Sequence, residues 1–152
     1  MNKQLKMKKK FIPKNVWMLL IPALFFVFDR IFKNIALKNI TASNFLFDFH
    51  YVANSGISWG LLKGNSALLL WISVIIVGVL LYFYKDLENA KLGTNLILIG
   101  AISNIFDRIL FGHIIDYIDF RFFPVFNIAD ACVVLGGIYI ILWFLFFEKK
   151  IK

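Results

Sequence analysis

The stretch IADACVVLGGIYIILWFLFF, residues 128–147, decides the fold, because its 20 residues carry a single charge, at Asp130. A helix needs about 20 apolar residues to cross roughly 30 Å of hydrocarbon. Residues 67–84 form a second apolar run, of 18 residues and with no charge at all. These two runs predict a membrane protein.

The composition of the whole chain agrees with this prediction. Of its 152 residues, 61% are hydrophobic and only 17% are charged, whereas soluble domains average about 45–50% and about 25%. A mean hydropathy of +0.78 also excludes intrinsic disorder, which requires low hydrophobicity. We therefore expect residues 1–152 to form a single integral membrane domain.

Two further runs complete the prediction of an all-α membrane protein with four transmembrane helices. One follows the basic N-terminal tail and is apolar until Asp29. Asp29-Arg30 stands where a cleaved signal peptide would have small residues, so this run is expected to remain as an anchor. The other is the most polar of the four, and its polar residues cluster toward one end. The predicted spans are residues 16–32, 67–84, 92–110 and 128–147.

The distribution of basic residues predicts the orientation. The N-terminal tail, the 85–91 loop and the C-terminal tail together hold 11 basic and 3 acidic residues, and the opposite side has no net charge. Basic residues mark the cytoplasmic side of membrane proteins, so both termini are expected in the cytoplasm. The net charge of +8 is explained by these ends, and we do not expect nucleic acid as a partner.

Two segments are expected outside the membrane. Between the first and second helices, aromatic residues alternate from Phe45 to Tyr51 and are followed by the turn signal Asn54-Ser-Gly56. This pattern predicts a short strand or small extracytoplasmic β-sheet on the membrane surface. Residues 111–127 are expected to form a short outer loop that carries Asp116.

Carboxylates converge on one side of the membrane. At 1.5 Å per residue, Asp29 and Asp107 lie roughly 20 Å and about 22 Å from the cytoplasmic face. Asp130 begins its helix from the outside, and Asp116 is in the outer loop. Because ionisable groups are costly within a membrane and usually mark function, this outer boundary is the predicted functional site.

Two of these carboxylates have cations nearby in the sequence. Asp29 has Lys33 at i+4, and Asp107 is followed by Arg108 and preceded on the same helical face by Asn104. We expect them to form a polar network that braces one helix against another.

Asp116 and Asp130 have no local cation, and they are candidates for a pair of carboxylates that shares one proton, as in aspartic proteases. The segment from Asn127 to Asp130 also fits a helix N-cap with an acid in the first turn. The two readings are compatible.

The sequence contains no motif for a metal site or for a serine or cysteine nucleophile. His50 and His113 do not have the spacing of a metal site, no nucleophile elbow is present, and Cys132 is expected to be a core thiol. Four glycines are expected to allow close helix packing: Gly93, Gly100, Gly136 and Gly137.

Five local sequences together resemble those of the lipoprotein signal peptidases, also called signal peptidase II. They run in the family's order from the first predicted span to the last: Asp29-Arg-Ile-Phe-Lys33, Asn54-Ser-Gly-Ile-Ser-Trp-Gly60, Gly100-Ala-Ile-Ser-Asn-Ile-Phe-Asp-Arg108, Gly112-His-Ile-Ile-Asp-Tyr-Ile-Asp119 and Phe126-Asn-Ile-Ala-Asp130.

The resemblance implies an aspartic endopeptidase of the bacterial plasma (inner) membrane with Asp116 and Asp130 as its catalytic dyad. Its substrates are diacylglyceryl-modified prolipoproteins, cut N-terminal to the lipidated cysteine at the extracytoplasmic face. No metal or cofactor is implied, and we expect a monomer in contact with membrane lipid. The implied supporting residues are Asp29, Lys33, Asn54, Gly56, Asn104, Asp107, Arg108 and Asn127.

The chain departs from the family's usual pattern in three places. Arg30 stands where glutamine is usual, Ile57 and Ser58 replace a pair of small residues, and the segment between the two dyad residues is short. Two other functions stay open: a small ion- or proton-coupled transporter, and a non-catalytic scaffold. A transporter needs polar residues at several depths, and the cytoplasmic halves of the second and fourth runs offer almost none.

Overall fold

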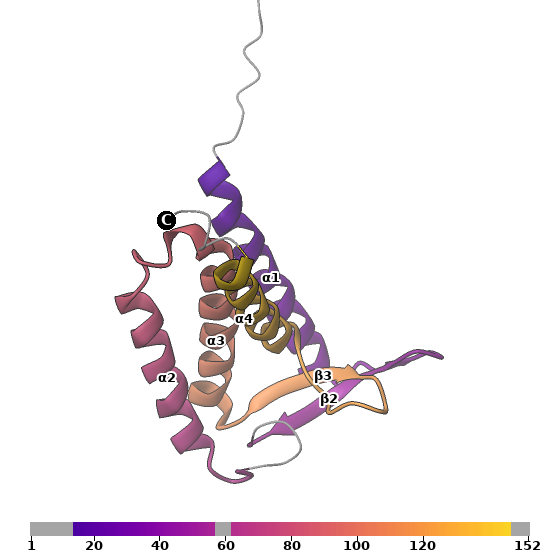
Figure 1. Ribbon diagram of the computed structural model, residues 1–152. Helices are drawn as coiled ribbons and strands as arrows, with labels where there is room; N and C mark the ends of the chain where they lie inside the picture. The colour runs from indigo at the N-terminus through magenta and orange to yellow at the C-terminus, as the bar shows by residue number, and fades with distance from the viewer. Residues whose placement is uncertain (1–13, 57–61, 147–152) are drawn as a thin grey trace, which may run out of the picture.

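Four helices stand side by side, and a small antiparallel sheet lies across one end of them (Figure 1). The computed structural model describes residues 14–56 and 62–146. The helices of these described residues are α1 (Lys14–Leu37), α2 (Ser66–Tyr82), α3 (Lys91–Phe111) and α4 (Ile128–Phe146), and the 3-10 turn η2 (Glu88–Ala90) precedes α3. The four predicted helices are confirmed in position, although α1 continues five residues beyond the predicted end at residue 32.

Within the described ranges, two helices are long and apolar enough to cross a membrane. They are η2 with α3, 24 residues with a mean hydropathy of 1.4, and α4, 19 residues with a mean hydropathy of 2.2. The apolar α2 has 17 residues, and α1 carries Asp29, Arg30 and Lys33 in its second half. Large apolar side chains cover the outer surfaces of the helices, and Leu24, Ile75 and Leu135 are each more than half exposed. Such a surface fits a hydrocarbon environment.

Glycines bring α3 and α4 into close contact. A β-carbon on Gly93 would lie 2.8 Å from the carbonyl oxygen of Gly136, and one on Gly136 would lie 2.5 Å from that of Gly93. A β-carbon on Gly100 would overlap the Ala129 carbonyl. The predicted packing role is confirmed for these three. It is wrong for Gly137, where an added β-carbon would have no atom within 4 Å.

A proline in α1 explains one buried polar residue of α3. Pro22 has no N–H, so it cannot donate the helical hydrogen bond to the carbonyl of Met18. The side-chain amide of Asn95 donates to that carbonyl instead, at 2.8 Å, and Asn95 accepts a hydrogen bond from the Tyr84 hydroxyl. Asn95 thus joins α3 to α1 at the end away from the sheet.

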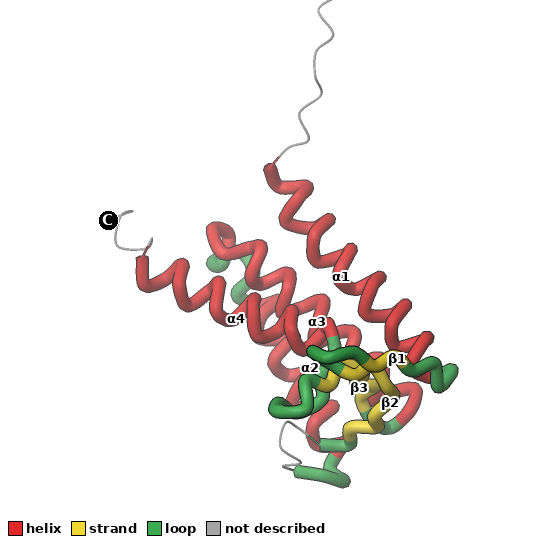
Figure 2. The backbone as a smooth tube through the Cα atoms, turned by 90° about the vertical axis from the view of Figure 1, so that its right-hand side faces the viewer, coloured by secondary structure: helices red, strands yellow, loops and turns green. Residues whose placement is uncertain are grey.

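The sheet has three strands, β1 (Ala42–Ser43), β2 (Asp48–Asn54) and β3 (Ile114–Asp119), in the order β1-β2-β3 (Figure 2). The sequence predicted a sheet only between the first two helices and a loop at 111–127. The loop prediction is wrong, because β3 comes from that segment and pairs with β2, Val52 opposite Asp116. Gly112, at φ 75°, ends α3 and turns the chain into β3.

The alternation of β3 separates two environments. Ile115 and Tyr117 are buried against Ala36 of α1, in the small core between the sheet and the helices. Successive side chains of a strand point to opposite faces, so Asp116, between them, points away from this core. The strand that was missed in the sequence therefore sets the direction of one of the predicted dyad residues.

Candidate active site

Asp116 is buried, with 1% of its surface exposed, and it accepts two amide hydrogen bonds. Asn54, at the end of β2, donates to Oδ2 at 2.8 Å, and Asn127 donates to Oδ1 at 2.7 Å. Strand pairing places Asn54 and Asp116 on neighbouring strands. Both predicted supporting residues therefore hold this carboxylate directly.

Asp130 lies in the first turn of α4 and forms a reciprocal cap with Asn127. Its backbone N–H donates to Asn127 Oδ1 at 2.8 Å, and the Asn127 N–H donates to Asp130 Oδ2 at 3.3 Å. The N-cap predicted from the sequence is confirmed. Asn104 of α3 donates to the other oxygen, Oδ1, at 2.7 Å.

Asn127 is the residue common to both carboxylates. Its side-chain amide donates to Asp116 Oδ1, while its backbone N–H and side-chain oxygen hold Asp130. The amide also lies 3.3 Å from Asn104 Oδ1. Two residues 14 positions apart in the sequence are thus brought to one place by a single fully buried asparagine.

No cation forms an ion pair with Asp116 or Asp130 within the described part of the chain. Burial and, after it, the negative charge of Asp130 raise the pKa of Asp116 to about 7, although the hydrogen bonds from Asn54 and Asn127 act in the opposite direction. A carboxyl group with such a pKa holds a proton near neutral pH, as a shared-proton pair requires.

The other two buried carboxylates have the opposite surroundings. Lys33 lies 2.8 Å from Asp29 Oδ2 and 2.7 Å from Asp107 Oδ2, and all three side chains are buried. Arg30 forms an ion pair with the other oxygen of Asp107. The predicted brace between α1 and α3 is confirmed, but the partners of Asp107 are Lys33 and Arg30 rather than the predicted Arg108.

The charged cluster is linked to the carboxylate pair and its neighbours by two sets of hydrogen bonds. Lys33 donates to Asn104 Oδ1 at 3.0 Å, which orients the Asn104 amide so that its nitrogen faces Asp130. A second link runs through Asp29 Oδ1, which accepts from the Tyr117 hydroxyl at 3.0 Å and from the Ala129 N–H at 3.2 Å.

Tyr117 and Ser103 were not singled out in the sequence. Tyr117 is buried, its pKa is raised by burial and by the charge of Asp29, and so its hydroxyl remains a donor. Ser103 donates to Asp29 Oδ2 at 2.6 Å. Their positions in the sequence could have indicated a role in the site, since Tyr117 directly follows Asp116 and Ser103 directly precedes Asn104.

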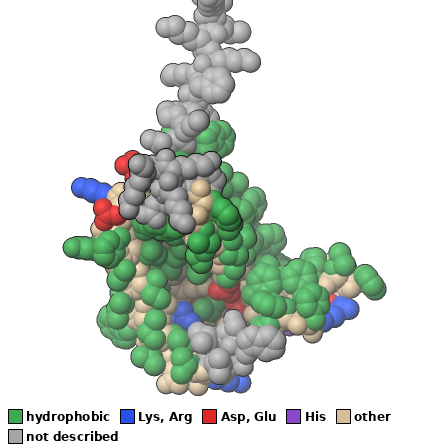
Figure 3. All heavy atoms as spheres, viewed as in Figure 1, with side chains coloured by type: hydrophobic (Ala, Val, Ile, Leu, Met, Phe, Trp, Pro, Cys, Tyr) green, Lys and Arg blue, Asp and Glu red, His purple; other side chains and the backbone are tan. Residues whose placement is uncertain are grey.

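Arg108 and Gly56 lie at the edge of the site. The Arg108 guanidinium approaches the Gly56 carbonyl at 3.4 Å, and the Gly56 N–H donates to Asn54 Oδ1 at 3.0 Å. Ile57 and Ser58 lie outside the described residues. Figure 3 shows acidic and basic side chains in a hollow between the apolar surfaces of the helices and the sheet.

The described residues contain no group of three His, Cys, Asp or Glu side chains able to hold a metal ion. What the geometry offers is a pair of carboxylates tied by amides. Such a pair can accept a proton at one member and donate one from the other.

The family model described as Signal peptidase (SPase) II matches residues 21–146 of this chain. The chain belongs to the signal peptidase II family. It is therefore a peptidase, a hydrolase of the aspartic type, in a family that processes lipoproteins. The matched residues include every side chain of the two clusters described above.

Relatives in the signal peptidase II family support this assignment over most of the chain. The lipoprotein signal peptidase of Halothermothrix orenii is 44% identical over 101 residues, which cover 64% of this chain and 70% of that protein. The lipoprotein signal peptidase of Clostridium acetobutylicum is 32% identical over 148 residues, covering 87% of this chain and 96% of that protein.

The fold has a solved counterpart. A structure described as a bacterial membrane enzyme, determined by the in meso method at 2.3 Å resolution, is similar with a TM-score of 0.77 at 30% identity. The match covers 84% of this chain and 87% of that one. The helical bundle with its small sheet is thus a membrane-enzyme architecture.

Proposed function

We propose that this signal peptidase II removes signal peptides from diacylglyceryl-modified prolipoproteins, cutting N-terminal to the lipidated cysteine, with Asp116 and Asp130 as the catalytic dyad. The observation that carries the proposal is the shared Asn127, which hydrogen-bonds both carboxylates while neither forms an ion pair among the described residues. The relatives are named lipoprotein signal peptidases, which supports prolipoproteins as the substrate class.

In the proposed mechanism the two carboxylates hold one proton between them. Asp116, whose pKa is raised to about 7, is the protonated partner and donates a hydrogen bond to the scissile carbonyl oxygen. Asp130, ionised, takes a proton from the attacking water as the new C–O bond forms. That proton then passes to the departing amine as the C–N bond breaks. No metal or cofactor takes part.

The remaining polar residues have supporting roles in this proposal. Asn54, Asn104 and Asn127 hold the two carboxylates, and the ion-paired cluster fixes α1 against α3. Arg108 and Gly56 border the hollow where the peptide would lie. The cluster residues are Asp29, Lys33 and Asp107.

The proposed topology follows from the charge distribution. The whole chain, residues 1–152, is one integral domain of the bacterial plasma (inner) membrane with four spans, and both termini are cytoplasmic. The sheet and the dyad then lie at the extracytoplasmic face, where the lipid tails of a substrate stay in the bilayer and the scissile bond meets water. The protein acts as a monomer.

The decisive experiment is cleavage of a diacylglyceryl-modified prolipoprotein by the purified protein in detergent. Asp116→Asn and Asp130→Asn are each expected to lose activity by about 10³-fold or more, because a dyad fails as a unit. Asp119→Asn is the matched control, since Asp119 is a partly exposed carboxylate at the end of the same strand as Asp116. It should retain activity.

Folding of the variants is checked by thermal unfolding followed by circular dichroism. If the folded Asp116→Asn or Asp130→Asn protein cleaves at the wild-type rate, the dyad assignment is wrong. If the wild type cleaves no diacylglyceryl substrate, the proposed function itself is wrong.

A further inference from the structure

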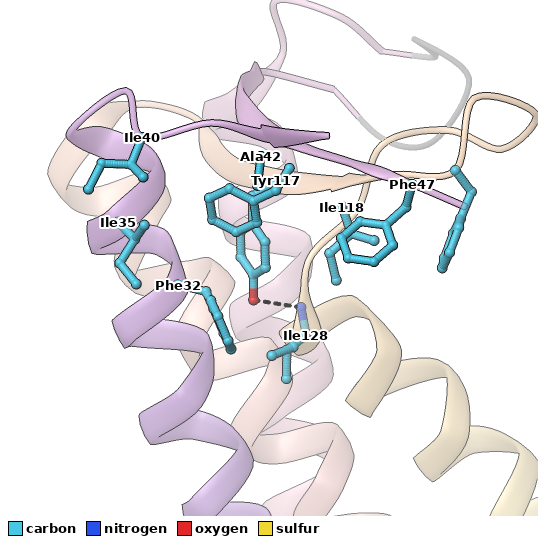
Figure 4. A pocket seen from close by; sticks show the side chains of 10 residues that line it. Phe32, Ile35, Ile40, Ala42, Phe47, Tyr117, Ile118 and Ile128 are labelled. Carbon is cyan, nitrogen blue, oxygen red and sulfur yellow. Dashed lines mark hydrogen bonds between the residues drawn. The ribbon is translucent and has the colours of Figure 1, made fainter. Parts of the chain in front are cut away.

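We propose that the apolar cavity between α1 and the sheet binds one acyl chain of a membrane phospholipid. The cavity has a volume of about 510 Å³. Its walls come from four parts of the chain: the last turns of α1, residues 40–49, β3 and the first residue of α4 (Figure 4). Leaving so large an apolar volume empty costs packing energy, and an apolar cavity does not hold water well.

The apolar side chains that line the cavity favour a hydrocarbon ligand. Its side chains are aliphatic or aromatic, for example Phe32, Ile35 and Phe49, and none is charged. The single polar side-chain atom among them, the Tyr117 hydroxyl, is already used, because it donates to Asp29 and accepts the N–H of Ile128 at 3.1 Å. A polar ligand would find no partner here, whereas ligand pockets for polar molecules supply placed polar groups.

The cavity is continuous with a surface that faces lipid. Phe28, Ile31 and Phe32 form an exposed apolar flank of α1, with exposed fractions of 43%, 46% and 37%. Phe32 belongs both to this flank and to the cavity wall. In Figure 1 the sheet extends past the helices on the side of α1. A chain in the bilayer beside α1 therefore reaches the cavity without leaving hydrocarbon.

An exposed cation is close in sequence to the cavity wall. Lys38 follows the last residue of α1 and precedes the lining residue Ile40 by two positions. It is exposed and makes no ion pair within the described residues. A phosphate group above an inserted chain has the complementary charge, so an anionic phospholipid fits best.

The geometry favours a resident phospholipid over the acyl chain of a substrate. Asp116 and Tyr117 are adjacent in β3 and point to opposite faces of the sheet. The cavity wall includes neither carboxylate of the pair, nor Asn54 or Asn127, which donate hydrogen bonds to Asp116. The lipid would therefore support the sheet that carries Asp116, and the inference depends on membrane insertion and not on the proposed cleavage.

Photocrosslinking tests the proposal. The full chain is placed in bilayer nanodiscs that contain phosphatidylglycerol with a diazirine in one acyl chain, and adducts are mapped by mass spectrometry. Adducts are expected in the cavity wall, at Ile35 or Ile40. Ala42→Trp fills the cavity from β1 and should reduce these adducts about tenfold. Thr41→Trp, one residue earlier and so on the opposite face, should leave them unchanged.

A second cavity-filling variant and a competition experiment distinguish loss of lipid binding from misfolding and from binding of substrate. Ile35→Trp fills the cavity from α1, so a folding defect of Ala42→Trp does not decide the outcome. Adducts spread over the helices and unaffected by either filling variant would overturn the proposal. Loss of the adducts when a saturating diacylglyceryl peptide is added would assign the cavity to the substrate instead, and would also overturn it.

Discussion

Two pairs of carboxylates, linked through the side chain of Asn104, differ in their partners. Asp29 and Asp107 share the buried ammonium of Lys33, at 2.8 and 2.7 Å. Asp116 and Asp130 share only the neutral Asn127. The first pair has its charge neutralised, and the second keeps the pKa of Asp116 raised to about 7. On the proposed assignment, identical side chains act as a brace where a cation is present and as a proton-transfer pair where none is.

Removing the cation from the braced pair is expected to have the largest effect. Lys33→Met leaves two buried carboxylates with their shared partner gone, and it should cost about 3–5 kcal/mol of unfolding free energy. Thermal unfolding in detergent measures this. Lys85→Met, at an exposed lysine between α2 and α3, is the matched control and should have no effect. A Lys33→Met protein as stable as the wild type would contradict the proposed brace.

The next largest effect, a loss of cleavage activity, is expected at Asn127, which hydrogen-bonds both Asp116 and Asp130. Asn127→Ser keeps an N-cap oxygen for α4 but removes the amide that donates to Asp116 at 2.7 Å. Stability should therefore change little, while kcat falls about 10²-fold, the typical loss when one oriented donor is removed. The comparison with Asn127→Ala, which also loses the cap, separates the two roles. Wild-type kcat in Asn127→Ser would argue against the bridge.

The pH dependence of cleavage sharpens the comparison further. If Asp116 must carry the shared proton, kcat/KM should fall as the pH rises through about 7. The hydrogen bond from Asn54 lowers this pKa, so Asn54→Leu should move the basic limb to higher pH. His113→Gln tests whether a histidine is responsible and should leave the limb in place. A limb that moves to lower pH in Asn54→Leu would contradict the assignment.

The same shift has a consequence for stability. The pKa of Asp116 rises from 3.8 to about 7 on folding, so the folded protein holds the proton more tightly. Its contribution to stability is complete below pH 3.8 and is lost as the pH rises through about 7.

The smallest effect is expected at Arg30, which adds a second cation to Asp107. Its side chain is 17% exposed, and Lys33 remains beside Asp107 when Arg30 is replaced. Arg30→Gln, which restores the residue usual in this family, should cost about 1 kcal/mol or less. Chemical denaturation at matched detergent concentration measures the difference. A loss as large as that of Lys33→Met would mean that Arg30 contributes as much as Lys33 to neutralising the cluster.

The parts of this site that depend on neighbours in the sequence were predictable. The Asp29–Lys33 pair spans one helical turn, and the Asn127–Asp130 cap spans three residues, so periodicity and capping rules find both. The four helices were also predictable, because long apolar runs have few alternatives in a membrane.

The contacts between distant segments were not predictable in the same way. Arg30 meets Asp107 across 77 positions, and Tyr117 meets Asp29 across 88. Strand β3 was taken for a loop because a six-residue strand gains its stability from pairing with β2, which leaves only a faint pattern in the segment itself. The identity of the key carboxylates could be inferred from the sequence, but their orientation required the fold.

The hydrogen bond from the Ala129 N–H to Asp29 joins residues 100 positions apart, so it can form only after both α1 and α4 have been synthesised. A ribosome delivers α1 first and α4 last. When α1 enters the membrane, the Ala129 N–H that donates to Asp29 has not yet been synthesised. Asn127 and Asp130, the neighbours of Asp116, are likewise still missing. The proposed proteolytic centre is complete only once the last helix has docked, so nascent chains of this peptidase carry no cutting activity while they are still being inserted.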